Sequence, residues 1–120
     1  MNYDALRALE QALRDSPEVQ EYKRLKDTVE ENETTRALIK EFKRLQILVQ
    51  MSAMSCQAVP EEDMQRFQQI SSLLYAGTDT SRYLLAEMRL QQVMADIYNA
   101  INQASGLSME IPGLSCGGGP

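Results

Sequence analysis

Apolar residues recur along the amino-terminal part of the chain every three or four positions, which is the repeat of an amphipathic helix. The residues that mark a first helix, over residues 3–14, are Leu6, Leu9 and Leu13. A second helix should begin at Ser16-Pro17-Glu18, because a serine cap there precedes a proline and an acid in the first turn. This helix should end near residue 31, and its apolar face consists of Val19, Tyr22, Leu25 and Val29.

A third helix is predicted over residues 32–55, starting at the polar sequence Asn32-Glu33-Thr34. Its apolar stripe consists of Leu38, Phe42, Leu45 and Val49. Residues 56–59 form a connection, and Pro60 with three following acids starts a fourth helix. The apolar face of that helix comprises Met64, Phe67, either Ile70 or Ser71, and Leu74, and Gly77 should end it.

The fifth and longest helix is predicted over residues 78–105 and carries two neighbouring apolar seams. One seam contains Tyr83, Glu87, Leu90, Met94, Ile97 and Ile101. The other contains Leu84, Met88, Gln91, Ala95 and Tyr98. Two adjacent seams make a wide apolar face, as on a helix that lies between several neighbours.

These elements predict an all-α fold: a bundle of about five helices dominated by two long antiparallel helices. Sustained alternation of apolar and polar residues, the mark of a half-buried strand, is absent. We divide the chain into a helical domain at 1–105 and a flexible, glycine-rich tail at 106–120. A chain of 120 residues built from long helices often needs a partner to cover its apolar stripes, so we expect dimerisation to complete the bundle.

Two stretches of the chain, residues 32–47 and 78–93, align with each other without a gap. Their identical pairs are Thr34 with Thr80, Arg36 with Arg82, Leu38 with Leu84, Glu41 with Glu87, and Gln46 with Gln92. Equivalent carboxylates in a helical bundle suggest a metal site, but such bundles add Glu-x-x-His pairs and this chain has no histidine. We therefore favour the alternative, in which Glu41 and Glu87 each pair with a nearby Arg or Lys beside an apolar seam.

Composition narrows the functional class. The net charge of −5 argues against broad electrostatic binding to nucleic acid or to an anionic membrane. The chain lacks histidine, the commonest general base, and carries no catalytic motif, so we predict that it is not an enzyme. Neither a signal-peptide core nor a stretch of roughly 18 apolar residues is present, which predicts a cytoplasmic protein.

Two sets of side chains are candidates for contact with partners. The expected partner or oligomer surface consists of Leu84, Met88, Leu90, Met94, Ile97, Met51 and Met54, although Met88 and Met94 also suit a core. A basic stripe runs along the third helix and consists of Arg36, Lys40, Lys43 and Arg44. It suits an acidic partner or a nucleic acid, but we favour a solvated face that pairs with nearby acids such as Glu41. Direct RNA binding is disfavoured because no aromatic residues alternate with the basic ones.

Cys116 has an unusual position, alone in the glycine-rich tail where it has no packing role. A thiolate there could bind a metal ion or an iron–sulfur cluster shared between chains. One cysteine per chain cannot complete a four-thiolate site, so we favour an exposed thiol with no cofactor.

An ordered set of motifs spanning residues 3–104 resembles the YlbF/YmcA family of small all-helical bacterial proteins. The motifs are Ser16-Pro17-Glu18, Tyr22-Lys23, Asn32-Glu33-Thr34, Leu38-Ile39, Phe42, Gln46, Gln50, Pro60, Tyr83-Leu84, Ala86-Glu87 and Ile97.

The resemblance implies a cytosolic, non-enzymatic regulator that forms homodimers or higher assemblies. It further implies a YaaT-like partner and an influence on ribonuclease Y, and through it on RNA processing, competence, biofilm formation and sporulation. Some members hold iron–sulfur clusters through cysteines near the carboxyl terminus. Cys116 is the only residue here onto which that role carries over, and a single cysteine departs from the family pattern.

Overall fold

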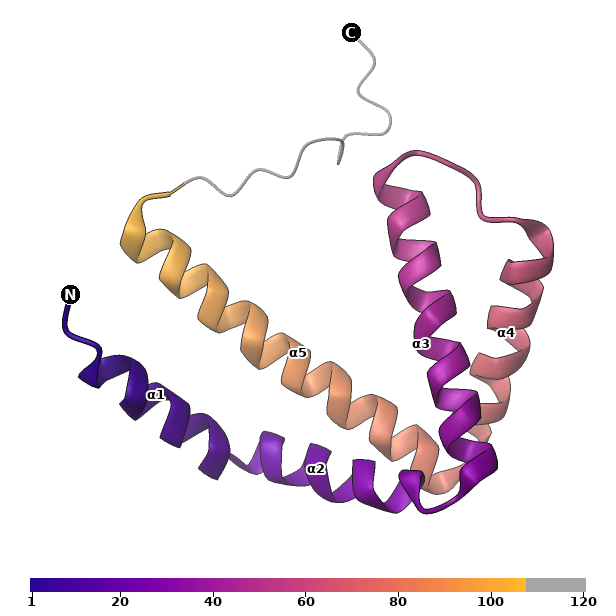
Figure 1. Ribbon diagram of the computed structural model, residues 1–120, viewed down its shortest axis with the longest axis horizontal. Helices are drawn as coiled ribbons and strands as arrows, with labels where there is room; N and C mark the ends of the chain where they lie inside the picture. Colours follow the sequence, from indigo (N-terminus) through magenta and orange to yellow (C-terminus); the bar gives the residue numbers. More distant parts are fainter. Residues whose placement is uncertain (108–120) are drawn as a thin grey trace, which may run out of the picture.

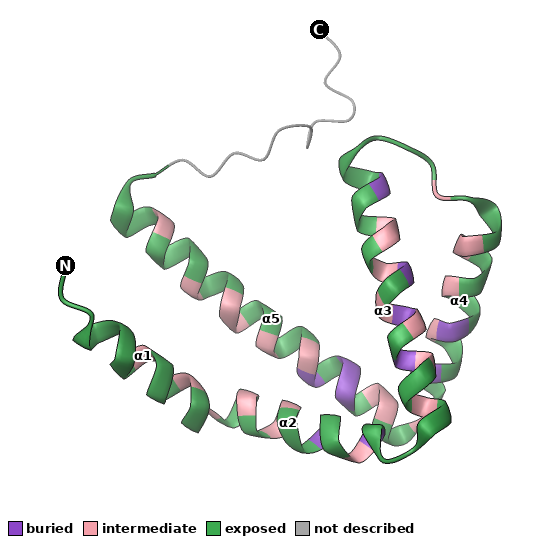
Figure 2. Cartoon of the chain, in the orientation of Figure 1, coloured by how far each residue is buried: buried purple, intermediate pink, exposed green. Residues whose placement is uncertain are grey.

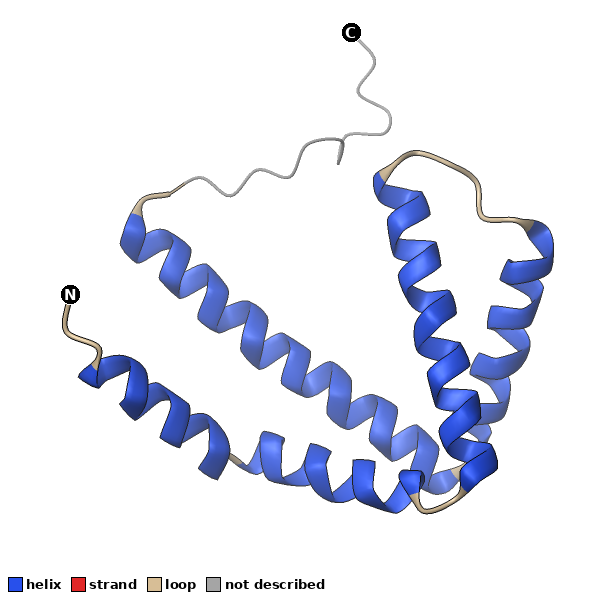
Figure 3. Cartoon of the chain, viewed as in Figure 1, coloured by secondary structure: helices blue, strands red, loops and turns tan. Residues whose placement is uncertain are grey.

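Five helices form two arms that meet at a corner and diverge from it like a V (Figure 1). The computed structural model describes residues 1–107, and every regular element in this range is an α-helix (Figure 3). The elements are α1 (Asp4–Asp15), α2 (Pro17–Glu30), α3 (Glu33–Met54), α4 (Glu61–Ala76) and α5 (Thr78–Ser105). The all-α prediction and the five predicted helices are confirmed, and each boundary lies within two residues of its expected place.

Polar caps define two of the helix starts as predicted. The Ser16 hydroxyl accepts a hydrogen bond from the Val19 amide at 3.3 Å at the start of α2. The Asn32 side-chain oxygen accepts one from the Thr35 amide at 3.0 Å at the start of α3. Each bond satisfies an amide that the first helical turn leaves without a partner. The connections on either side of α2 are therefore short: Ser16 alone before it, and Glu31 and Asn32 after it.

The two longest helices, α3 and α5, do not pack along their lengths, so the predicted pairing of two long antiparallel helices needs correction. Each has a different main neighbour: α5 lies against α2 in one arm, and α3 lies against α4 in the other. The short connection after α3 folds α4 back as a hairpin, and the rings of Phe42 and Phe67 stack with centroids 5.3 Å apart. Because α4 covers the apolar stripe of α3, α5 packs against α2 instead.

The core lies at the corner and between α3 and α4 (Figure 2). Buried residues come from four helices, and α1 contributes none. The hydrophobic members are Leu25, Val29, Ile39, Phe42, Leu45, Ile70, Leu74, Tyr83, Leu84 and Ala86. All the buried residues of α5 fall in its first third, so the core stops well short of the ends of the α1–α2–α5 arm.

The molecule is thin and wide for its length. Its radius of gyration is 17.8 Å, whereas a compact chain of 120 residues has a value of about 14 Å. The shortest extent is 17 Å, less than two helix diameters of about 10 Å each. Within the described residues, each helix therefore has a face without a neighbouring helix.

Gly77 alone connects α4 to α5 and ends α4 as predicted, in an extended rather than a left-handed conformation. Its φ of −80° and ψ of 142° are accessible to any residue. Glycine is needed for space instead, because a Cβ atom there would collide with the Thr80 hydroxyl, which donates a hydrogen bond to the Leu74 carbonyl. Gly106 does take the left-handed conformation, at φ 74°, and ends α5 as predicted.

Replacing Asn32 with alanine should lower the free energy of unfolding by about 1 kcal/mol, because the Thr35 amide loses its cap. Replacement with glycine should cost only a few tenths of that, since glycine is tolerated at caps. Urea unfolding followed by circular dichroism measures both. Equal losses for the two variants would mean that the Asn32 side chain does not act as a cap.

Candidate partner-binding surface

The outer half of the α1–α2–α5 arm exposes apolar side chains that no other part of residues 1–107 covers completely. After Ala86, no residue of α5 is buried (Figure 2). Leu90, Met94 and Ile97 are half-buried, and Ile101 is 50% exposed. One seam of α5 thus continues beyond the core into solvent, and the predicted wide apolar face lacks a neighbour over this part.

Two shallow grooves lie along α5 and meet at Glu87. The first lies against α2, has a volume of about 430 Å³, and is lined by Tyr22, Glu87, Leu90, Gln91, Met94, Ala95 and Tyr98. The second lies between α5 and the α3–α4 hairpin, and Phe42, Phe67 and Met88 contribute to its lining. Both share Glu87 and Gln91, so a mostly apolar surface runs from one arm to the other across the corner.

The residues predicted to form the partner surface fall into three groups in the folded chain. Met51, Met54 and Met88 are exposed, and Met51 is 62% accessible. Leu90, Met94 and Ile97 are half-buried, and of these Leu90 and Met94 line the first groove. Leu84 is only 4% exposed and belongs to the core at the corner, so its assignment to the partner surface is corrected. The pattern of α5 could not separate Leu84 from its neighbours, because the corner buries only the start of that seam.

A polar junction connects the two arms inside the corner. Lys43 of α3 donates a hydrogen bond of 2.7 Å to the Tyr83 hydroxyl of α5. Its ammonium also lies 3.0 Å from Glu87 Oε2, an ion pair whose direction of approach is not that of a hydrogen bond. The Glu87 side chain is 17% exposed and that of Lys43 35% exposed, so the two charges are partly shielded from water. We call Lys43, Tyr83 and Glu87 the corner junction.

Tyr83 is the centre of this junction. Its ring is 2% exposed and stacks on Tyr22 of α2 with centroids 5.5 Å apart. Burial raises the pKa of the Tyr83 hydroxyl, and the neighbouring Tyr22 and Glu87 act in the same direction. The phenol therefore keeps its proton at neutral pH and connects α2, α3 and α5 as a neutral group.

Glu41, the counterpart of Glu87 in the repeat, has its own cations. Arg44 binds both of its oxygens, at 2.8 and 3.0 Å, and Arg66 of α4 donates to Oε1 at 3.1 Å. These hydrogen bonds, first that of Arg44 and then that of Arg66, lower the pKa of Glu41 from 4.5 to about 2. Each of the two glutamates therefore pairs with Arg or Lys, as predicted in preference to a shared metal site.

The predicted basic stripe does not form one uniform face. Arg44 is occupied by Glu41, and Lys43 is directed into the corner junction. Arg36 lies 3.9 Å from Glu33 in an exposed pair, while Lys40 has no ion pair within residues 1–107. Pairing with nearby acids, the favoured alternative, thus accounts for three of the four cations.

Residues 1–107 contain no group of three or more His, Cys, Asp or Glu side chains that could hold a metal ion. Cys116, the one residue predicted to be available for a cluster, lies outside the described residues, as does all but the start of the predicted tail at 106–120. Among the five described helices, none combines the length and hydropathy required to span a membrane.

Replacing Lys43 with methionine should destabilise the protein by about 1–2 kcal/mol, because Glu87 would keep a partly buried charge without a cation. The double variant Lys43→Met/Glu87→Leu should regain most of this loss. Arg36→Met is the matched control: it breaks an exposed pair and should cost about 0.5 kcal/mol or less. Urea titration of the wild type, the single variants Lys43→Met and Glu87→Leu, and the double variant gives the coupling energy, and additive losses would contradict the junction.

The stabilisation from Glu41 should depend on pH. Its pKa is lower in the folded chain than in the unfolded chain, so its contribution is complete above about pH 5 and disappears as the pH falls from 4.5 toward 2. Glu41→Gln should therefore lower the melting temperature at neutral pH, with the difference from wild type vanishing near pH 2. Calorimetry across this range tests it; a difference that stays constant with pH would show that charge is not the cause.

Known proteins are similar to this chain over most of its length. The family model described as "Control of competence regulator ComK, YlbF/YmcA" matches residues 2–104. A UPF0342 protein from Caldicellulosiruptor saccharolyticus is 30% identical over 112 residues, which cover 93% of each chain. A UPF0342 protein from Staphylococcus epidermidis is 37% identical over 102 residues, which cover 82% of this chain and 87% of that relative.

A solved structure shares the arrangement of helices. It is titled "Protein of Unknown Function (DUF964) from Bacillus stearothermophilus", has a TM-score of 0.68 and is 22% identical, and the match covers 87% of this chain and 92% of that one. At this identity the likeness concerns the fold alone. The family model, matched from residue 2 to residue 104, confirms the resemblance seen in the motifs: the chain belongs to the YlbF/YmcA family.

Proposed function

We propose that the protein is a cytoplasmic, non-enzymatic regulatory scaffold that works through protein–protein contacts, beginning with a second copy of itself. The observation that carries this proposal is the uncovered apolar seam of α5 from Leu90 to Ile101. Large apolar side chains that continue a core stripe into solvent mark a surface for association. The grooves beside the seam are shallow and mainly apolar, which suits a helix better than a small substrate.

The shape of the arm favours a second copy as the first partner. Helices α2 and α5 form a layer of two antiparallel helices, and one such layer cannot enclose an apolar stripe. Two layers related by a twofold axis make a four-helix arrangement in which each seam of α5 covers the other. The exposure of α1 supports this view, because its apolar residues Leu6, Leu9 and Leu13 are not buried in the described part of the single chain.

Family membership supports a regulatory role for the assembly. The description of the family names control of the competence regulator ComK. We propose that the assembled protein acts with a YaaT-like partner on ribonuclease Y and thereby on RNA processing, with effects on competence, biofilm formation and sporulation. Met51 and Met54, exposed at the far end of the α3–α4 arm, then remain available to such a partner when the α5 seams are paired.

The purified protein should be a dimer of about 27 kDa, twice the 13.6 kDa of the chain, in size-exclusion chromatography with light scattering. Ile101→Asp should give a helical monomer, because it places a charge on the exposed seam without entering the core. Ile97→Asp, at a half-buried position, should dissociate the dimer and also lower the stability of the single chain.

Gln103→Asp is the matched control, since it adds the same charge to an exposed position of α5 two residues further on, away from the seam. It should leave the dimer intact. A monomeric wild-type protein would contradict self-association. A dimer that persists in Ile101→Asp would place the interface on another face.

A further inference from the structure

A cleft between α2 and α3 is lined by four cationic side chains, although the chain as a whole is acidic. Lys26 comes from α2, and Arg36, Lys40 and Lys43 come from successive turns of α3. Glu30 is the only acidic residue in the lining. The sharp connection between α2 and α3 brings these positions together, and the cleft therefore carries a local positive charge within a protein of net charge −5.

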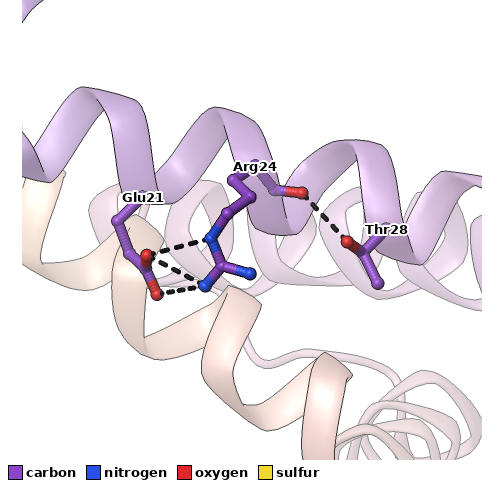
Figure 4. A network of polar contacts seen from close by, with 3 residues as sticks. All are labelled: Glu21, Arg24 and Thr28. Atoms are coloured by element: carbon purple, nitrogen blue, oxygen red, sulfur yellow. Dashed lines mark hydrogen bonds and ion pairs between the residues drawn. The ribbon is translucent and has the colours of Figure 1, made fainter.

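Two of these cations are without acidic partners, unlike many others in the described range. Arg24 lies only two residues before Lys26. Two of its guanidinium nitrogens donate hydrogen bonds to the two carboxylate oxygens of Glu21, with a shortest distance of 2.9 Å (Figure 4). Arg44 is likewise bound to Glu41. Lys26 and Lys40 form no ion pair within residues 1–107, so their ammonium groups are free to bind an external anion.

The floor of the cleft is apolar and its size is limited. Val29, Ile39 and Tyr83 line it beneath the charged rim, and the cavity measures about 300 Å³. Val29 and Ile39 are less than 10% exposed, so the floor belongs to the packed corner and is held in place. An apolar floor lowers the local dielectric constant and strengthens attraction between the lysines and a bound carboxylate. The cavity has room for one or two acidic side chains rather than a large folded surface.

We propose that this cleft binds an acidic segment of a protein partner, with Lys26 and Lys40 binding its carboxylates. Charge complementarity is the basis of this assignment. The proposal also rests on the scaffold function proposed above, because it specifies the chemistry of one partner of that scaffold. A nucleic acid fits less well, because the net charge of −5 opposes a long polyanion and Tyr83 is too deeply buried to stack on a base. The cleft lies on α2 and α3, apart from the seam on the outer half of α5.

Fluorescence anisotropy with a labelled octaglutamate peptide tests the proposal on the full-length protein at low ionic strength. The peptide should bind, and an octaglutamine peptide of the same length should not. Lys26→Gln and Lys40→Gln should each weaken binding by about fivefold, and the double variant by about twentyfold. Both sites are exposed, so circular dichroism of the variants should match the wild type.

Lys23→Gln is the matched control, because it removes the same charge from an exposed position of α2 that does not line the cleft, and it should bind as wild type does. Absence of binding, or an equal loss in Lys23→Gln, would overturn the proposal. Competition by single-stranded RNA at lower concentrations than octaglutamate would overturn it in favour of a nucleic-acid site. Light scattering of the same samples separates the two proposals, since a dimer that does not bind the peptide refutes only the acidic-segment site.

Discussion

The burial of Tyr83 at the corner is the constraint on which the rest of the structure depends. Its ring packs on Tyr22, and its hydroxyl accepts a hydrogen bond from Lys43, so α2, α3 and α5 meet at one side chain. Leu84 and Ala86 beside it are also buried, while no residue of α5 beyond them is. The arms diverge from this point, because only here do helices from both arms contribute to one core. The open shape and the uncovered seam both follow from a core that ends at the corner on the side of the α1–α2–α5 arm.

The internal repeat uses the same residue in two ways, and this difference gives the fold its asymmetry. Glu41 binds Arg44 of its own helix and Arg66 of α4, which holds the α3–α4 hairpin together. Glu87 pairs with Lys43 across the corner and so connects the arms. Even the starts of the two repeated helices differ, since Asn32 caps α3 whereas Gly77 precedes α5 without a side-chain cap. The duplicated stretch therefore builds one hairpin and one corner.

Local features could be predicted from the sequence, and long-range pairing could not. The helix boundaries follow from caps, from Pro17 and from the apolar period, all of which act within a few residues. Which helix covers which stripe depends on competition between distant segments, so the pairing of α5 with α2 was missed. A salt bridge at Glu87 was predicted, but the identity of its cation, the contact of Lys43 with Tyr83 and the place of Lys26 in the cleft were not, for the same reason. After the end of α3, Cys56 takes the left-handed conformation, at φ 59°, where a glycine is usual. No pattern in the sequence predicts this.

In the α1–α2–α5 arm the core ends at the corner, and this bears on the self-association proposed above. Segments with few buried contacts open more readily than the core. The described residues of α1 and the outer part of α5 are of this kind, since neither contributes a buried residue. Their order in a single chain is therefore the weakest part of the structure, and a second copy that covers the α5 seam would stabilise that part most. The α3–α4 arm, closed by its own stacked rings and by Glu41, would change little. Under the proposed function, such a scaffold would present a constant surface on one arm and a surface that depends on protein concentration on the other.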